Sequence, residues 1–516
     1  MITSAPPAKF DRYTQLADLA AALKRTLRRS LIPLGVLFAV VVARLSFVGN
    51  PGMLAFAFIA IGTLIVLSVW ADRGYGLPLL PMFAAQHMIS YGLPIAVNNE
   101  VVLNYPQSFV TGAGLEVLLF CGAMAVAWRI GMEMSRPAPP RCYALQGFHK
   151  DGTARLSRIG FTLVVVSTGF NLLQSMGEIE IFYALLPTGT NSILTAIISA
   201  VGMCGFFLMS MMLGSGDLSV WKRTLFWLFL ALNCAILAGG FLLSAAGTLL
   251  GSVLIGLIWS TGRIPWRYLT VAVSLLAFFN LGKFTMRERY WGLDGQVQTE
   301  VALLDLPRTY TEWSQASLEI ITGSAEVDDK TDSKSSRSGA SGGQSLLQRI
   351  NNLQNMLYVI DALEVGHISP LGGSTYTIIV PLLIPRIIWP DKPRTHEGQV
   401  MLNVHFGRQD LASTFQTYIA WGLLPEACGN FGRYVGAIML GLFLGGMSAW
   451  LENFTARRLV LSLEGFLSFV IFLGLANSFE MVASVMVTSI FQSIVPIILA
   501  CMPFVELQSS RRPELP

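Results

Sequence analysis

Long apolar runs alternate with short polar segments along most of the chain. Most runs are about 20 residues long, enough for a helix to cross a hydrocarbon core of about 30 Å. They are too long and continuous for the strands of a membrane barrel. The pattern predicts an all-α, polytopic membrane helical bundle with about 12 transmembrane helices, at residues 31–48, 52–70, 76–97, 109–128, 159–176, 193–214, 224–240, 241–261, 268–282, 434–452, 459–477 and 482–505.

Composition and the placement of charge agree with this pattern. Apolar residues make up 53% of the 516 positions, charged residues only 13%, and the mean hydropathy is +0.58. With the N-terminus inside, the inner segments carry 21 of the 35 Lys and Arg, and the short outer loops carry none. Arg44 lies in the first span, and the other 13 lie between Lys283 and Arg433. Because long loops cross regardless of their charge, we expect both termini to be cytoplasmic and segment 283–433 to lie outside.

The segments outside the spans differ in character. Within the inner segment 1–30, residues 10–30 alternate apolar and basic positions. This spacing predicts either a helix on the inner membrane surface or an ordinary basic flank. Spans 1–9 occupy 31–282, spans 10–12 occupy 434–505, and 506–516 is a cytoplasmic tail.

The outer segment 283–433 has three parts of its own. Residues 324–344 are charged and rich in Ser and Gly, which predicts a disordered insert. Residues 345–366 carry apolar positions at the spacing of an amphipathic helix. Residues 369–393 hold a short apolar stretch broken by Pro381 and Pro385, which predicts a re-entrant or interfacial hairpin.

Cations gather in the outer segment close to this apolar stretch. A guanidinium group binds phosphate oxygens in a bidentate manner. We therefore expect these side chains to bind a lipid-linked phosphate or pyrophosphate; the alternative is that they bind ordinary lipid headgroups or solvate the loop. The candidates are Arg287, Arg289, Arg349, Arg386, Lys392, Arg394 and Arg408.

Glu426 is the first candidate for a general base, because it stands just before the tenth span. Its alternative role is that of a helix-start carboxylate that interacts with the helix dipole. His396 and His405 are fallback candidates, although surface positions are typical for such residues. His87 and Glu464 are ionisable residues inside spans, where they pair or line a cavity.

Several common chemistries have no motif in the chain. The sequence lacks CxxC and HExxH patterns, a P-loop and a dinucleotide fingerprint. We therefore expect no metal and no cofactor. Gly441 and Gly445 form a GxxxG pattern, which in a membrane helix indicates close packing.

One stretch of about 60 residues resembles the bacterial oligosaccharide repeat-unit polymerases, the O-antigen and exopolysaccharide polymerases of the Wzy type. It begins with GGSTYTIIVPLLIPRIIWPDKP and continues about 30 residues later with TxQTxxAWGLLPEAxGNFG. The specific pieces are Pro385-Arg386, Trp389-Pro390, Lys392-Pro393, Glu426 and Asn430-Phe431-Gly432. The large outer loop late in the chain also matches this family, whereas the insert at 324–344 does not.

The resemblance implies a type-C glycosyltransferase-like fold in the bacterial inner membrane. It implies transfer of a growing glycan from undecaprenyl pyrophosphate onto a lipid-linked repeat unit at the periplasmic face. The implied partners are the lipid-linked oligosaccharide, membrane lipids and a chain-length regulator protein. In this interpretation the outer cations hold the donor pyrophosphate, and Glu426 activates the acceptor hydroxyl.

Two other functions fit parts of the pattern. An O-antigen ligase-like enzyme shares the fold and the donor but passes the glycan to a different final acceptor. A 12-span polysaccharide transporter or flippase belongs to a different class. Major-facilitator transporters place a long inner loop between two six-span halves, whereas the long loop here is expected outside, after span nine.

Overall fold

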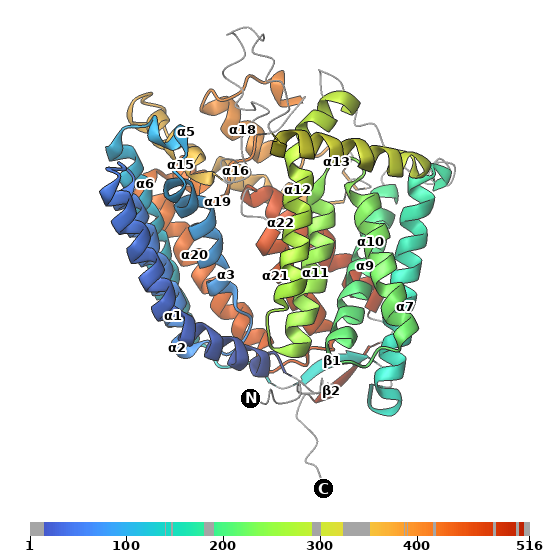
Figure 1. The fold of residues 1–516 in the computed structure, drawn as a ribbon. Coiled ribbons are helices and arrows are strands. Elements are labelled where there is room, and N and C mark those ends of the chain that lie inside the picture. The colour runs from blue at the N-terminus through green and yellow to red at the C-terminus, as the bar shows by residue number, and fades with distance from the viewer. Residues whose placement is uncertain are drawn as a thin grey trace. The chain divides into compact units, whose positions relative to one another are not determined.

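Helices make up most of the described structure, with one pair of short strands (Figure 1). The computed structural model describes residues 15–139, 141–145, 148–179, 190–291, 301–322, 351–385, 388–389, 391–415, 419–477, 481–501 and 505–509. The chain forms two compact units: unit 1 contains Thr153–Arg349, and unit 2 contains Phe10–Gly152 and Ile350–Pro516.

Nine helices in the described part of the chain are long and apolar enough to cross a membrane. Each coincides with one of the predicted spans, so the chain is a multi-pass helical membrane protein. They are α1 (Leu16–Phe47), α2 (Met53–Arg73), α6 (Gln107–Met134), α7 (Phe148–Ser175), α9 (Thr190–Gly214), α10 (Val220–Ala238), α11 (Leu243–Thr261), α12 (Trp266–Trp291) and α20 (Arg433–Thr455).

The other three predicted spans are shorter or interrupted helices, so the number twelve stays a prediction. Segment 76–97 is divided into α3 (Leu79–His87), the π-helical turn η1 (Met88–Gly92) and α4 (Leu93–Ala96). The last two correspond to α21 (Leu463–Asn477) and α22 (Ala483–Cys501). Helix α12 continues without a break beyond the predicted end of the ninth span at 282, to Trp291, and the point at which it leaves the membrane stays a prediction.

Unit 2 is built on the close contact of α6 with α20. A Cβ atom on Gly441 would lie 2.4 Å from the Phe120 carbonyl oxygen, and one on Gly445 would lie 2.2 Å from that of Met124. The two glycines therefore let the helix backbones approach, as their GxxxG spacing predicts. On α6, Gly114 plays the same part toward α2.

One end of unit 2 gathers four segments that are far apart in sequence. Strand β1 (Arg141–Leu145) pairs antiparallel with β2 (Val505–Ser509). The Tyr143 N–H donates to Glu464 Oε2 at 3.0 Å, and Gln15 forms a bridge with Leu459. The N-terminal helix, the segments after α6 and α20, and the C-terminal strand therefore lie together. Their cytoplasmic placement stays a prediction.

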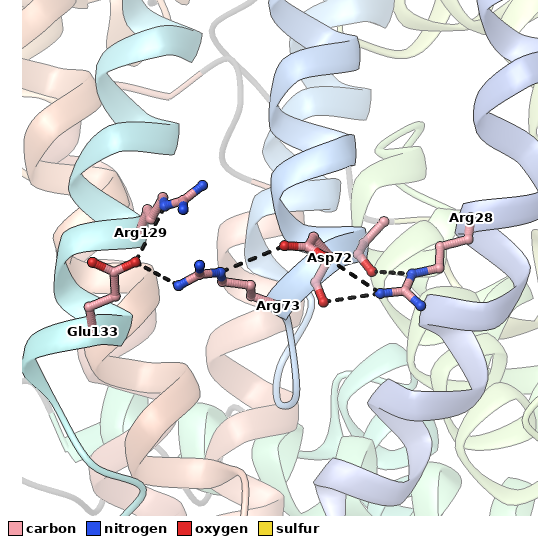
Figure 2. A network of polar contacts seen from close by, with 6 residues as sticks. Arg28, Asp72, Arg73, Arg129 and Glu133 are labelled. Atoms are coloured by element: carbon pink, nitrogen blue, oxygen red, sulfur yellow. Dashed lines mark hydrogen bonds and ion pairs between the residues drawn. The ribbon is translucent and has the colours of Figure 1, made fainter.

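A row of exposed ion pairs connects three helices, α1, α2 and α6, at this end (Figure 2). Arg28 of α1 lies 3.7 Å from Asp72 at the end of α2. Arg73 bonds to Glu133 of α6 at 2.6 Å, and Arg129 lies 3.4 Å from the same carboxylate. These segments are the ones that the charge pattern places on one side of the membrane.

The basic segment predicted at 10–30 and the first span form one helix, α1. Figure 1 shows α1 bending from a stretch across the end of unit 2 into an upright stretch. Pro33 lies inside the helix and cannot donate to its hydrogen-bond ladder, which accounts for a bend. Residues 10–14 lie outside the described part.

Unit 1 packs α7 and α9–α12 around apolar side chains, among them Val164, Phe206, Met209, Phe226, Leu230 and Val253. A further helix, α13 (Leu306–Thr322), follows the short turn η2 (Leu303–Asp305) and lies across the end of α12 (Figure 1). The Trp313 indole of α13 is buried and donates to the Phe279 carbonyl at 2.7 Å. The sequence analysis did not predict α13.

Short helices cover the other end of unit 2, away from β1 and β2 (Figure 1). The segment predicted as an amphipathic helix at 345–366 contains α15. The predicted hairpin at 369–393 contains α16 and α17; its depth in a bilayer stays a prediction. The predicted insert at 324–344 lies outside the described residues. The elements are α5 (Glu100–Leu103), α15 (Asn352–Glu364), α16 (Ser374–Thr377), α17 (Ile379–Leu383), α18 (Glu397–His405), η3 (Ser413–Phe415) and α19 (Leu423–Phe431).

Candidate functional site

The candidate site is this second end of unit 2, which we call the polar end. We define it by α15, α16, α18 and α19 with the first residues of α20 and α22. Most of the stretch that resembles the polymerases lies here, and so do several buried polar side chains. Among them are Asn355, Thr375, Asn403, Glu426 and Asn430.

Glu426 on α19 is fully buried and joins three elements. Its Oε1 accepts from the Thr375 hydroxyl of α16 at 2.7 Å, and its Oε2 accepts from the Ala483 N–H of α22 at 2.6 Å. Asn430, one turn further along α19, donates through Nδ2 to the Thr375 hydroxyl oxygen at 2.9 Å. The sequence predicted a carboxylate near the membrane face, and the structure places it inside the protein.

Burial changes the proton affinity of this carboxylate. Loss of water raises the pKa of Glu426 to about 7, against the opposing effect of the Ala483 N–H and the Thr375 hydroxyl. Glu426 lies outside the nine candidate spans. A carboxyl group whose pKa lies near neutrality takes up and releases a proton at physiological pH, as a general base must.

Asn430 leaves one polar atom open beside Glu426. Its Oδ1 is buried and has no hydrogen-bond partner among the residues that the structure describes. A buried acceptor without a partner costs free energy, about 1–3 kcal/mol. The Oδ1 atom can therefore accept a hydrogen bond from a further donor, while the Nδ2 of the same amide is bonded to the Thr375 hydroxyl oxygen.

Arg408 holds a positive charge beside two aromatic rings that also contact each other. Its guanidinium carbon lies 5.5 Å from the ring centre of Tyr358 and 5.6 Å from that of Trp421. Arg408 Nη1 donates to Asn355 Oδ1 at 2.6 Å, and no carboxylate in the described part of the chain forms an ion pair with this residue. Burial lowers the pKa of Arg408, because the charged guanidinium has lost contact with water. An anion bound to the guanidinium would offset this cost in free energy.

The frame around Arg408 is built from two buried asparagines. Asn355 of α15 donates to the carbonyls of Ala420 and Trp421 at 3.0 and 2.8 Å. Asn403 of α18 accepts from the Trp421 indole at 2.7 Å. These bonds fix both the ring and the amide oxygen that orient the guanidinium.

Other predicted cations already have protein partners. The Lys392 ammonium donates to the carbonyls of Leu382 and Ile384 at the end of α17, at 2.7 and 2.5 Å. Arg394 pairs with Glu397 at 3.1 Å. Lys392 therefore holds the local backbone in place, and the charge of Arg394 is balanced by a neighbouring carboxylate. Arg349 and Arg386 lie outside the described residues.

Arg287 and Arg289 belong to unit 1, at the end of α12. The Arg287 guanidinium donates to the Phe241 carbonyl at 3.0 and 3.2 Å and stacks on Trp291, 4.3 Å from the ring centre. Arg289 is exposed. Their part in phosphate binding stays a prediction.

The three histidines named in the sequence analysis each contact nearby protein groups. His396 faces Gln399 Oε1 at 2.8 Å within one turn of α18, and His405 faces the Ser369 carbonyl at 2.8 Å. His87 stacks on Tyr91 and Phe120. It does not pair with Glu464, which bonds to β1 and lies 3.9 Å from Arg458.

Two buried carboxylates escaped the sequence analysis. Glu116 of α6 accepts from Arg433 Nε at 2.5 Å, and Arg433 also pairs with Glu364 at the end of α15. Glu452 of α20 accepts from the backbone N–H groups of Tyr75 and Gly76. Each of them is a lone acidic residue inside an apolar run. The same pattern marked Glu464 as a candidate, so it could also have marked Glu116 and Glu452.

No group of three or more His, Cys, Asp or Glu side chains that could hold a metal ion occurs in the part of the chain that the structure describes. The polar end instead offers a guanidinium, a carboxylate near neutrality, a hydroxyl and amide groups. This set suits the binding of an anion and the transfer of a proton. Comparison with known proteins finds no matching family model, curated protein or solved structure.

Proposed function

We propose that the chain is a membrane glycosyltransferase that polymerises lipid-linked oligosaccharide repeat units at the polar end of unit 2. The single observation that carries the proposal is Glu426, a buried carboxylate with a pKa of about 7 in the stretch that resembles the polymerases. The uncompensated charge of Arg408 in the same unit supports it.

In this proposal, Arg408 binds the pyrophosphate of the donor, undecaprenyl pyrophosphate carrying the growing glycan. The hydroxyl oxygen of the acceptor repeat unit attacks the anomeric carbon of the donor. The bond between that carbon and the pyrophosphate oxygen breaks, and the pyrophosphate keeps the electron pair. The guanidinium stabilises the charge that develops on the leaving group.

The acceptor proton passes to Glu426 by way of Thr375. The Thr375 hydroxyl gives its proton to the carboxylate and takes the one from the acceptor, so no charge is left on the hydroxyl. Thr375 and Glu426 are both buried. In this proposal the acceptor therefore reaches them only when α16 moves away from α19; Gly372 and Gly373, with φ of +62° and +91°, directly precede α16.

The test uses the purified chain in vesicles with undecaprenyl-pyrophosphate-linked repeat units, and reads the product as a ladder of glycan lengths. Arg408→Ala is expected to lower the rate of chain extension at least about 100-fold, while Arg408→Lys keeps part of it. Arg129→Ala, at the opposite end of unit 2, is the control and should leave the ladder unchanged. A normal ladder from folded Arg408→Ala would contradict the assignment.

The same assay separates the other functions. Transfer of one glycan to an acceptor that is not a repeat unit would favour an O-antigen ligase-like enzyme. Movement of the lipid-linked unit across the vesicle without formation of a glycosidic bond would favour a transporter. Either outcome would overturn the polymerase proposal.

A further inference from the structure

Unit 1 contains an apolar groove between α10, α11 and α12, closed at one end by α13. Its volume is ≈ 360 Å³. The lining includes Trp227, Ala235, Ala238, Tyr268, Leu275 and Tyr310. The alanine side chains of α10 are too small to fill the groove, and the larger side chains, such as Trp227 and Tyr268, form its walls.

The chemistry of the lining suits a hydrocarbon and little else. None of the lining residues is charged. The hydroxyls of its two tyrosines are already bonded: Tyr268 donates to the Leu250 carbonyl at 2.8 Å, and Tyr310 donates to that of Ala235 at 2.9 Å. A polar ligand would lose its water without gaining partners, a cost of about 1–3 kcal/mol for each group.

The groove opens sideways from helices that cross the membrane. Its rim residues Val271 and Leu275 are 59% and 52% exposed, and Trp227 is 40% exposed. All three lie on candidate spans, α10 or α12. We therefore expect the surface they expose to face the hydrocarbon of the bilayer, which would let a chain enter from the side.

The length of the groove points to one leaflet. Along α10 it runs from Trp227 to Ala238, which at 1.5 Å per residue is about 16 Å. This is about half of a hydrocarbon core of about 30 Å. Helix α13, which carries Tyr310 and exposes Leu318 and Ile321, lies across the end of α12 (Figure 1).

We propose that this groove is a binding site for one acyl chain of a membrane phospholipid, which enters sideways and ends beneath α13. The inference does not rest on the glycosyltransferase proposal, because the groove lies wholly within unit 1. The bound chain fills the space that the alanines leave and completes the packing of α10 against α12.

The first test leaves the protein unaltered. The full chain is reconstituted in phosphatidylglycerol vesicles with a small fraction of phosphatidylcholine that carries a photoreactive diazirine on its acyl chain. After irradiation, mass spectrometry of the peptides should find labels on the groove residues Ala235 and Leu275 at least about 5-fold more often than on Leu228. Leu228 is 58% exposed on the same helix and does not line the groove. Equal labelling would overturn the proposal.

The second test fills the groove. Ala235→Phe should abolish this excess and lower the phospholipid that co-purifies in detergent by about one molecule per chain, whereas Leu228→Phe should change neither. Should Ala235→Phe fail to fold, Ala231→Phe offers a second way to obstruct the site from its exposed edge. Unchanged phospholipid in the folded variants, or a polyprenyl phosphate in its place, would overturn the assignment. Glycan ladders are measured separately, so failure here leaves the polymerase proposal untouched.

Discussion

Glu426 and Glu452 are two buried carboxylates of unit 2 with different sets of donors. Glu452 Oε1 accepts from the Tyr75 and Gly76 N–H groups at 2.7 and 2.9 Å, and its Oε2 accepts from the Trp128 indole at 2.9 Å. Glu426 accepts from one N–H and one hydroxyl. N–H donors hold a carboxylate but cannot relay a proton, whereas a hydroxyl can do both. Glu452 is thus suited to hold the loop between α2 and α3, and Glu426 to transfer a proton.

The largest expected effect comes from Glu452→Ala. The change leaves three donors without an acceptor in a place that water does not reach, so we expect a loss of about 3–5 kcal/mol in the free energy of unfolding. Thermal unfolding in detergent measures it. Glu452→Gln keeps one acceptor oxygen and should lose less. Equal stability of Glu452→Ala and the wild type would show that the loop is held by other contacts.

The pH dependence of the free energy of unfolding tests the burial of Glu426. The pKa of Glu426 is raised to about 7 in the fold, above its ordinary value of 4.5. The folded protein therefore binds the proton more tightly, and its stability is full below pH 4.5 and is lost as the pH rises toward 7. The shift corresponds to about 3 kcal/mol. Glu426→Gln, which resembles the protonated form, should lose this part of the pH dependence; an unchanged slope would contradict the assignment.

A smaller effect should follow from Thr375→Val. The change removes the hydroxyl but keeps the shape of the side chain, so Glu426 retains only the Ala483 N–H as a donor. We expect chain extension to slow by about 10- to 100-fold, with a smaller change in stability of about 1–2 kcal/mol. Thr375→Ser restores the hydroxyl and should restore most of the rate. A slow Thr375→Ser variant would mean that packing, not the hydroxyl, matters here.

The smallest effect is expected at the charges in Figure 2. Glu133→Gln removes the carboxylate between Arg73 and Arg129, whose side chains are 43% and 51% exposed. Exposed ion pairs contribute less than about 1 kcal/mol and weaken with salt. Thermal unfolding at low and high salt should show a small difference that disappears at high salt. A loss as large as that of Glu452→Ala would contradict the distinction between buried and exposed charges.

The sequence predicts the helices better than it predicts the site. Runs of about 20 apolar residues predict the nine long helices, and the spacing of Gly441 and Gly445 predicts the close contact that the structure contains. Helix α13 carries buried positions such as Leu306, Trp313 and Ala316 at helical spacing, the same signal that predicted a helix at 345–366, so it was missed although the signal was present. The continuation of α12 to Trp291 was missed because polar residues end the apolar run without ending the helix.

The environment of a charged residue could not be predicted from the sequence. Arg408 and Lys392 look alike in a list of cations. In the fold, Lys392 binds carbonyls of its own segment, while Arg408 lies beside the rings of Tyr358 and Trp421, which are distant from it or from each other in sequence. The environment of Arg408 depends on packing between distant segments, and that of Lys392 depends on how the chain turns after α17. The burial of Glu116 and Glu452 could have been predicted, since acidic residues inside apolar membrane runs are rare and usually face the protein interior.

The most direct test of the central claim is the rate of glycan chain extension by Glu426→Gln, measured in vesicles between pH 5 and pH 9. The wild-type rate should rise as the pH passes about 7, because only the unprotonated carboxylate accepts the acceptor proton. Glu426→Gln should fold, keep its thermal stability near pH 5, and extend glycans at least about 100-fold more slowly without that rise. A folded Glu426→Gln variant with the rate and pH profile of the wild type would contradict the account.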